Sequence, residues 1–198
     1  MKDFLKPSIY GQKLTLKEKF VTSVGEFPKV ESLTIAGMLL AVRVVLGYFS
    51  NFSLTIIPTI KFTFSFLPIS ICSALLGPVM GIIVGGLGDI LSFIINPQGA
   101  YFFGWTLNAM LTGLVYGLLL YKNNITVIRT AISRVIIAFV IEVPLGTYWL
   151  IISGVSQKAY KVLFASRAIK QLAFIVFEVV LILIIGNVVI KSIQKIKA

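Results

Sequence analysis

Four charged residues could do chemistry, because each lies within or beside an otherwise apolar stretch. Arg43 lies deep in one stretch and Asp89 lies near the end of another. Arg167 and Lys170 lie near the start of a third apolar stretch. Ionised groups in such segments usually pair with one another or face a cavity or ligand. The three cations outnumber the acid, so we favour binding of a ligand carboxylate, to which guanidinium groups are well suited, over internal pairing alone.

Aromatic residues next to Pro- and Gly-containing turns form the second candidate group. Tyr101 and Phe102 follow one such turn, and Trp149 follows another. An interfacial belt of Tyr and Trp accounts for most other aromatic residues of the chain without a ligand. These three are better placed to stack on a planar ring. With the charged residues, they predict a site for a flat, polar small molecule.

Two further carboxylates, Glu142 and Glu178, lie nearer the middle of the apolar segments. We expect them to complete internal ion pairs and assign them no ligand role. Proton transfer is the alternative, because carboxylates at that depth can carry protons.

The elements that must position these residues are membrane-spanning helices. The chain has 198 residues, of which 58% are hydrophobic and 13% charged, and its mean hydropathy is +0.99. At about 20 residues per span, it has room for about six helices and no separate ATP-hydrolysing domain. Histidine is absent and Cys72 is the single cysteine, which we interpret as a small buried hydrophobe. We therefore predict no metal site, no cofactor and no catalysis.

The predicted fold class is an all-α, integral membrane bundle of six transmembrane helices. If the N-terminus is cytoplasmic, twelve of the 18 Lys and Arg residues fall on that side, with Arg134 counted there at the start of a helix. The positive-inside rule then puts both termini in the cytoplasm. The outward connection 50–61 ends at Lys61, a further candidate for ligand binding. The six apolar segments are 33–49, 62–76, 79–95, 105–121, 131–152 and 165–190.

The chain divides into a basic cytoplasmic extension, residues 1–31, and a membrane domain, residues 32–198. The extension lacks the apolar core of a signal peptide. Its stretch 13–21 is either an amphipathic helix on the membrane surface or part of a disordered tail. Both interpretations remain open at this point.

Small residues at four-residue spacing indicate close helix packing. Gly77, Gly81 and Gly85 share one helix face, and we interpret them as contacts within the bundle. The first apolar segment also carries small residues, which pack either inside the bundle or against a separate membrane subunit: Ala36, Gly37 and Ala41.

Residues 77–122 read GPVMGIIVGGLGDILSFIINPQGAYFFGWTLNAMLTGLVYGLLLYK. This stretch resembles the core of the substrate-binding (S) components of energy-coupling factor (ECF) vitamin transporters, and within them the folate family. Phe103 departs from the pattern, because the loop usually has Pro there, and the basic extension is longer than usual. Supporting pieces are AVRVVLGYFS at 41–50, IKFTFSFLPI at 60–69, TYWLI at 147–151 and SRAIKQL at 166–172.

The resemblance implies a multi-pass protein of the bacterial plasma membrane with an outward-facing vitamin pocket. It also implies docking to a shared transmembrane (T) subunit and to two cytoplasmic ABC-type ATPases, which would hydrolyse ATP in place of this chain. Small residues of the first helix would contact the T subunit, which strengthens the docking interpretation of Gly37 and Ala41, with Ala36 nearby.

For folate, each candidate residue acquires an expected role. Asp89 or the amide of Asn108 would accept hydrogen bonds from the pterin edge, and Tyr101, Phe102 and Trp149 would stack on rings. The cations Arg43, Arg167 and Lys170 would neutralise the glutamate tail. Three alternatives remain: an S component for riboflavin, thiamine or pantothenate, an intramembrane enzyme, and a structural or assembly protein.

Overall fold

The computed structural model describes residues 14–52, 64–97, 100–154 and 159–197, and these residues are helical apart from short connections. The predicted all-α fold class is therefore confirmed. The helices are α1 (Leu16–Val24), α2 (Val30–Phe52), α3 (Phe66–Leu76), α4 (Pro78–Ile95), α5 (Phe103–Leu120), α6 (Val127–Ile136), the π-helical η2 (Ile137–Glu142), α7 (Pro144–Ile152) and α8 (Tyr160–Lys197).

Five stretches of the described chain are long and apolar enough to cross a membrane, and α3 is a shorter apolar helix. The six predicted segments thus correspond to helices. Every residue of α3 is buried, so its backbone is shielded from lipid although the helix is too short to span it. Pro68 lies in the first turn of α3 and does not break the helix. The five spanning stretches are Val30–Tyr48, Pro78–Ile95, Phe103–Leu120, Val127–Ile152 and Tyr160–Val189.

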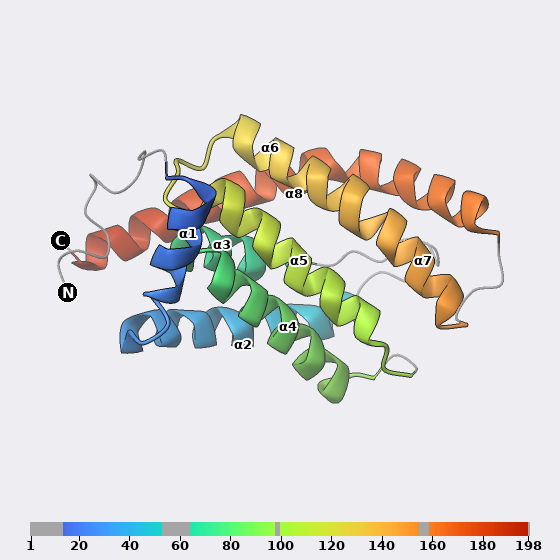
Figure 1. Ribbon diagram of the computed structural model, residues 1–198, viewed down its shortest axis with the longest axis horizontal. Coiled ribbons are helices and arrows are strands. Elements are labelled where there is room, and N and C mark those ends of the chain that lie inside the picture. Colours follow the sequence, from blue (N-terminus) through green and yellow to red (C-terminus); the bar gives the residue numbers. More distant parts are fainter. Residues whose placement is uncertain (1–13, 53–63, 98–99, 155–158, 198) are drawn as a thin grey trace.

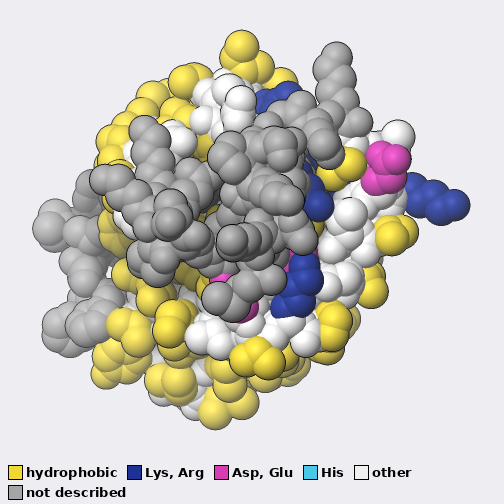
Figure 2. Space-filling view, turned by 90° about the vertical axis from the view of Figure 1, so that its left-hand side faces the viewer, with side chains coloured by type: hydrophobic (Ala, Val, Ile, Leu, Met, Phe, Trp, Pro, Cys, Tyr) yellow, Lys and Arg dark blue, Asp and Glu magenta, His cyan; other side chains and the backbone are white. Residues whose placement is uncertain are grey.

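The long helices run side by side along the molecule, whereas α1 runs across them at one end (Figure 1). Helix α3 lies in the middle, in contact with α2, α4, α5 and α8. Its side chains contribute to both hydrophobic clusters of the core. Cys72 belongs to one of these clusters and is completely buried, as predicted. Figure 2 looks onto the end where α1 lies and shows hydrophobic side chains around much of its rim.

Glycines bring α4 and α5 into backbone contact. A Cβ added at Gly81 would lie 2.6 Å from the carbonyl oxygen of Gly113. A Cβ at Gly85 would lie 2.9 Å from the carbonyl carbon of Ala109. Any larger residue would force the helices apart, so the predicted packing role of the α4 glycines within the bundle is confirmed.

The predicted helix at 131–152 starts earlier, at Val127, and changes its winding in the middle. The amide of Val143 donates to the carbonyl of Ala138 at 2.9 Å, a π-type bond across five residues. Pro144 follows directly and has no amide hydrogen to continue the regular pattern. The extra residue in this turn sets the direction in which Glu142 leaves the helix.

The prediction that Arg134 lies among the cytoplasmic surface charges is wrong. It is the eighth residue of α6, and its side chain is 1% exposed. It therefore does not contribute to the surface charge that orients the chain. The remaining basic residues still favour a cytoplasmic N-terminus, which stays a prediction.

Candidate functional site

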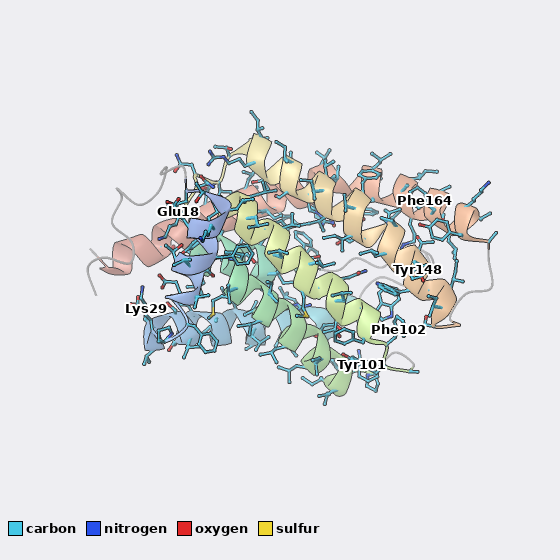
Figure 3. All side chains as sticks on the ribbon, in the orientation of Figure 1. Glu18, Lys29, Tyr101, Phe102, Tyr148 and Phe164 are labelled. Carbon is cyan, nitrogen blue, oxygen red and sulfur yellow. The ribbon has the colours of Figure 1, made fainter. Side chains whose placement is uncertain are left out.

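The aromatic candidates gather at the end of the bundle opposite α1. Tyr101, Phe102 and Tyr148 lie together at that end, and Glu18 and Lys29 lie at the other (Figure 3). The first turns of α5 face the end of α4 on one side and α7 on the other. Helix α5 therefore joins the two halves of the candidate site.

Arg43 reaches from α2 onto the backbone of α4 and is buried. Its Nη1 donates to the carbonyl of Val84 at 2.7 Å and also to that of Gly85. A Cβ at Gly88 would lie 2.9 Å from Cζ of Arg43, so the absence of a side chain there makes room for the guanidinium. The Nε of Arg43 is buried and has no hydrogen-bond partner among the described residues. The side chain is held in place and keeps one donor without a partner in the described part of the chain.

Asp89 begins a chain of polar contacts between α4 and α5. Its Oδ2 accepts a hydrogen bond from Oγ1 of Thr106 at 2.7 Å, and Thr106 in turn contacts the hydroxyl of Tyr101 at 2.7 Å. Arg43 and Asp89 also attract one another electrostatically. Two predicted ligand residues, Asp89 and Tyr101, are thus connected through Thr106. Thr106 was not predicted, because a hydroxyl in an apolar helix often bonds only its own backbone.

Trp149 stands at the centre of the aromatic half of the site. Its ring lies 5.6 Å from that of Phe102 and 5.1 Å from that of Tyr148. A Cβ at Gly104 would lie 2.6 Å from Cδ2 of Trp149, so this glycine lets the indole approach α5. The indole Nε1 donates to Oδ1 of Asn108 at 3.1 Å. The oxygen predicted to accept from a ligand already accepts from Trp149, which leaves the Asn108 amide nitrogen as the group that could donate to one.

Arg167 approaches the same place from α8. Its Nη2 donates to the backbone carbonyl of Glu142 at 3.0 Å. A Cβ at Gly146 would lie 2.6 Å from this Nη2 and 3.7 Å from Nδ2 of Asn108. The guanidinium therefore passes over Gly146 towards Asn108. Its Nε is buried without a hydrogen-bond partner in the described part of the chain.

The remaining predicted cations are placed differently. Lys170 lies one turn beyond Arg167 in α8 and interacts electrostatically with Glu178. Lys170 therefore belongs to the charge network around Glu178 in the middle of the bundle. Lys61 lies outside the described residues.

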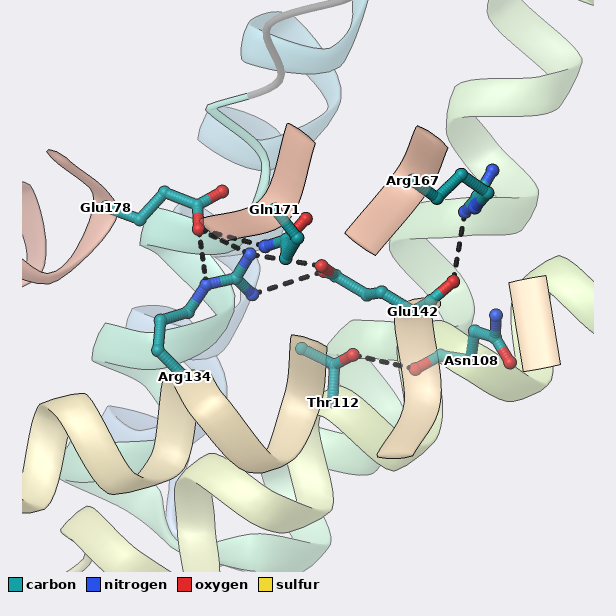
Figure 4. A network of polar contacts seen from close by, with 7 residues as sticks. All are labelled: Asn108, Thr112, Arg134, Glu142, Arg167, Gln171 and Glu178. Atoms are coloured by element: carbon teal, nitrogen blue, oxygen red, sulfur yellow. Dashed lines mark hydrogen bonds and ion pairs between the residues drawn. The ribbon is translucent and has the colours of Figure 1, made fainter. Parts of the chain in front are cut away.

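A buried ion network lies next to this site and contains the two mid-membrane carboxylates (Figure 4). Arg134 Nη2 lies 3.1 Å from Oε2 of Glu142 and 2.6 Å from Oε2 of Glu178. The amide of Gln171 donates to Glu178 at 3.2 Å. The expected internal pairing of Glu142 and Glu178 is confirmed, and their common partner is the buried Arg134. The charge of Lys170 balances part of the second carboxylate.

Glu142 connects the network to the site. Its side chain binds Arg134, and its backbone carbonyl accepts from Arg167. Glu142 is the last residue of the π-helical turn. Arg167 is therefore positioned by a residue that is itself fixed by a buried ion pair.

The three small residues of α2 face different surroundings. Ala36 is buried in the core of the chain itself. Gly37 and Ala41 are exposed, and a Cβ added at Gly37 would meet nothing within 4 Å. Gly37 and Ala41 are thus open to a partner, whereas Ala36 packs inward.

The arrangement suits the binding of a ligand. Asp89 and several aromatic rings lie around the first turns of α5, and two guanidinium groups approach from α2 and α8. No group of His, Cys, Asp or Glu within the described ranges could hold a metal ion. Helices of membrane-spanning length position all of these residues. Fold and site together define a multi-pass membrane protein with a ligand-binding site at one end of its bundle.

Residues 31–192 match the family model of the ECF transporter, substrate-specific component, and the chain belongs to this family. It is therefore a multi-pass subunit of a bacterial membrane transporter and not an enzyme.

Two relatives and one solved structure are similar along most of their length. "Folate transporter FolT" of Clostridium novyi (strain NT) is 33% identical over 159 residues, which cover 80% of this chain and 88% of that protein. "Folate transporter FolT" of Leuconostoc mesenteroides subsp. mesenteroides is 28% identical over 130 residues, covering 63% and 67%. A structure described as FolT bound with folic acid matches with a TM-score of 0.69 and 28% identity, covering 80% of this chain and 94% of that one.

Proposed function

We propose that this chain binds folate from outside the cell and delivers it inward as the substrate-specific subunit of an ECF-type importer. The arrangement of Asp89, Trp149 and Arg167 around the first turns of α5 carries the proposal, since it offers an acceptor, a ring and a cation at one end of the bundle. The similarity to folate transporters over most of the chain supports it.

The chemistry of folate matches each part of this arrangement. Its pterin is flat and has a donor-rich edge, for which Asp89 is the acceptor. Its glutamate tail carries carboxylates, for which the guanidinium groups of Arg43 and Arg167 are donors. A neutral vitamin would offer no carboxylate to these two guanidinium groups. Tyr101, Phe102 and Trp149 would contact the rings between Asp89 and Arg167.

The first experiment is a thermal unfolding series of the purified protein with folate, riboflavin, thiamine and pantothenate. A ligand at 100 times its dissociation constant adds about 2.7 kcal/mol to the free energy of unfolding, which shifts the midpoint measurably. We expect a shift with folates alone, and calorimetry would then give the affinity. A shift with a different vitamin would retain the transporter class and refute folate, and no shift with any of them would favour a structural role.

Arg167→Ala is expected to weaken folate binding about tenfold or more, because a hydrogen bond to a charged group contributes about 1.5–3 kcal/mol. Calorimetry on the detergent-solubilised protein measures it. Lys161→Ala is the matched control, since Lys161 is an exposed cation in the same helix. If both variants bind folate like the parent, Arg167 has no part in the site.

Transport would require a T subunit and two ABC-type ATPases, and we assign the exposed Gly37–Ala41 face of α2 to the T subunit. Gly37→Leu would fill the open space at this face and create an overlap costing about 1–3 kcal/mol, so the amount of T subunit that co-purifies should fall about tenfold. Folate binding by the isolated chain should not change. Ala173→Leu also introduces a leucine, on the exposed surface of α8, and should have no effect on assembly. Normal assembly of Gly37→Leu would exclude this face.

A further inference from the structure

Helix α1 has its polar side against the protein and its apolar side outward. Lys19 and Ser23 are 7% and 0% exposed, whereas Leu16 and Val24 are 64% and 56% exposed. Phe20 lies between these two on the same face and is also exposed. A helix packed on a water-soluble protein has the opposite arrangement, with its apolar stripe facing the core. The outward side of α1 is therefore built for a non-aqueous environment.

The polar side of α1 is occupied by the ends of other helices. The Ser23 hydroxyl donates to the carbonyl of Leu76 at 2.9 Å and accepts from the amide of Val79 at 3.1 Å. Lys19 Nζ donates to the carbonyl of Leu118 at 2.6 Å. These contacts satisfy backbone groups at the end of α3, the start of α4 and the last turn of α5, which have no partner within their own helices. The rotation of α1 about its axis is thereby set, and its apolar face has to point away.

The turn into α2 sets the direction of α1. Glu26 accepts from the hydroxyl of Ser32 at 2.9 Å and pairs with Lys29 at 2.8 Å. With these contacts in place, α1 lies across the ends of the long helices (Figure 1). Because the long helices are the membrane spans, a helix that crosses their ends runs along the membrane surface.

The apolar face of α1 continues into the lipid-facing surface of the bundle. Phe27, Val30 and Leu33 are exposed and follow directly in the chain, and the last two belong to the first spanning helix. The surface of α2 that faces the acyl chains and the outward surface of α1 are thus joined along the chain through the exposed Phe27. A lipid bilayer covers the exposed surface of α2. The simplest occupant of the outward surface of α1 is therefore the interface of the same bilayer.

Basic residues accompany this face. Lys17 is exposed next to Leu16 on α1. Lys29 follows in the turn, and its side chain is 48% exposed. Long basic side chains beside an apolar helix face reach out to the headgroup region, where they attract anionic lipids.

From these observations we infer that α1 is an interfacial helix that embeds Leu16, Phe20 and Val24 in the headgroup–acyl boundary of the membrane and places Lys17 on anionic lipid headgroups. The occupant is lipid, and no further protein is needed to cover this face. The inference concerns the end of the molecule opposite the candidate ligand site and does not depend on the identity of the ligand.

Spin labels at single introduced cysteines test the burial of α1. The variants are Phe20→Cys and Val24→Cys, with Glu18→Cys as the matched control, since Glu18 is exposed on a polar part of the same helix. The parent chain serves as the labelling blank because Cys72 is fully buried. Each labelled protein is reconstituted into vesicles of phosphatidylcholine with phosphatidylglycerol, and collisions of the label with oxygen and with a water-soluble nickel chelate are measured. We expect oxygen to dominate at positions 20 and 24 and the chelate to dominate at 18.

Lys17→Gln tests the headgroup contact. In vesicles containing phosphatidylglycerol, this substitution should raise chelate access at position 24, and in pure phosphatidylcholine it should change nothing. Chelate access at positions 20 and 24 equal to that at 18 would overturn the inference, as would protection that arises only when the transporter's other subunits are added. Equal protection in both kinds of vesicle, with or without Lys17, would overturn the anionic-lipid contact. Folate binding measured on the same samples separates failure of this inference from failure of the proposed function.

Discussion

Arg134→Met is expected to lower the free energy of unfolding by roughly 3 kcal/mol, the lower end of the range for a buried ion pair, because it leaves two partly buried carboxylates without their common cation. Arg134 donates to both Glu142 and Glu178 from a position that is almost fully buried. Methionine fills much of the volume of the arginine side chain. The loss in free energy of unfolding would therefore come from the removed charge and not from a cavity. Denaturant titration of the detergent-solubilised protein, followed by circular dichroism, measures the difference.

Two further variants separate the charge effect from a general effect of the substitution. Arg129→Met removes a half-buried arginine from the same helix and should stay within about 0.5 kcal/mol of the parent. The positive charge of Arg129 repels that of Lys19. Burial lowers the pKa of Lys19, and Arg129 lowers it further to a smaller extent. Adding Glu142→Gln and Glu178→Gln to Arg134→Met should recover much of the loss. A variant Arg134→Met as stable as the parent would mean that the network does not stabilise the bundle.

Asp89→Asn is expected to weaken folate binding between about tenfold and 100-fold, since an ionised acceptor contributes about 1.5–3 kcal/mol to a hydrogen bond from a ligand donor. The substitution preserves the shape of the side chain and removes its charge. It also removes the attraction that Asp89 exerts on Arg43, so two groups of the site are affected together. Calorimetric titration with folate measures the loss.

Thr106→Val distinguishes contact with the ligand from positioning of the carboxylate. It removes the hydrogen bond that Thr106 donates to Asp89 and leaves the charge in place. We expect a smaller loss of affinity than for Asp89→Asn, because the carboxylate would remain available but less well oriented. Equal losses in both variants would show that Asp89 acts only through Thr106, and unchanged affinity of Asp89→Asn would remove the carboxylate from the site.

The sequence alone was enough to predict the helical class, the approximate helix segments and several candidate residues. Continuous apolar segments of spanning length predict helices, because in lipid a helix pairs every backbone polar group within its own segment. Charged residues such as Arg43 and Asp89 stand out because they are unfavourable in such segments. The close packing of α4 and α5 also follows from their glycines, since small residues are what allow helices in lipid to touch.

Only the tertiary structure decided which of these groups meet. Arg134 and Glu178 are 44 residues apart and Trp149 and Asn108 are 41 apart, and no local period predicts such pairs. The π-helical turn before Pro144 sets the direction of Glu142, and thereby the place of Arg167. From the sequence, residues 13–21 could be an amphipathic helix or part of a disordered tail. The structure shows a helix there, and the orientation of α1 depends on the exposed helix ends that Ser23 and Lys19 satisfy. Local sequence sets where helices form, whereas the partners of polar groups are set by packing between distant segments.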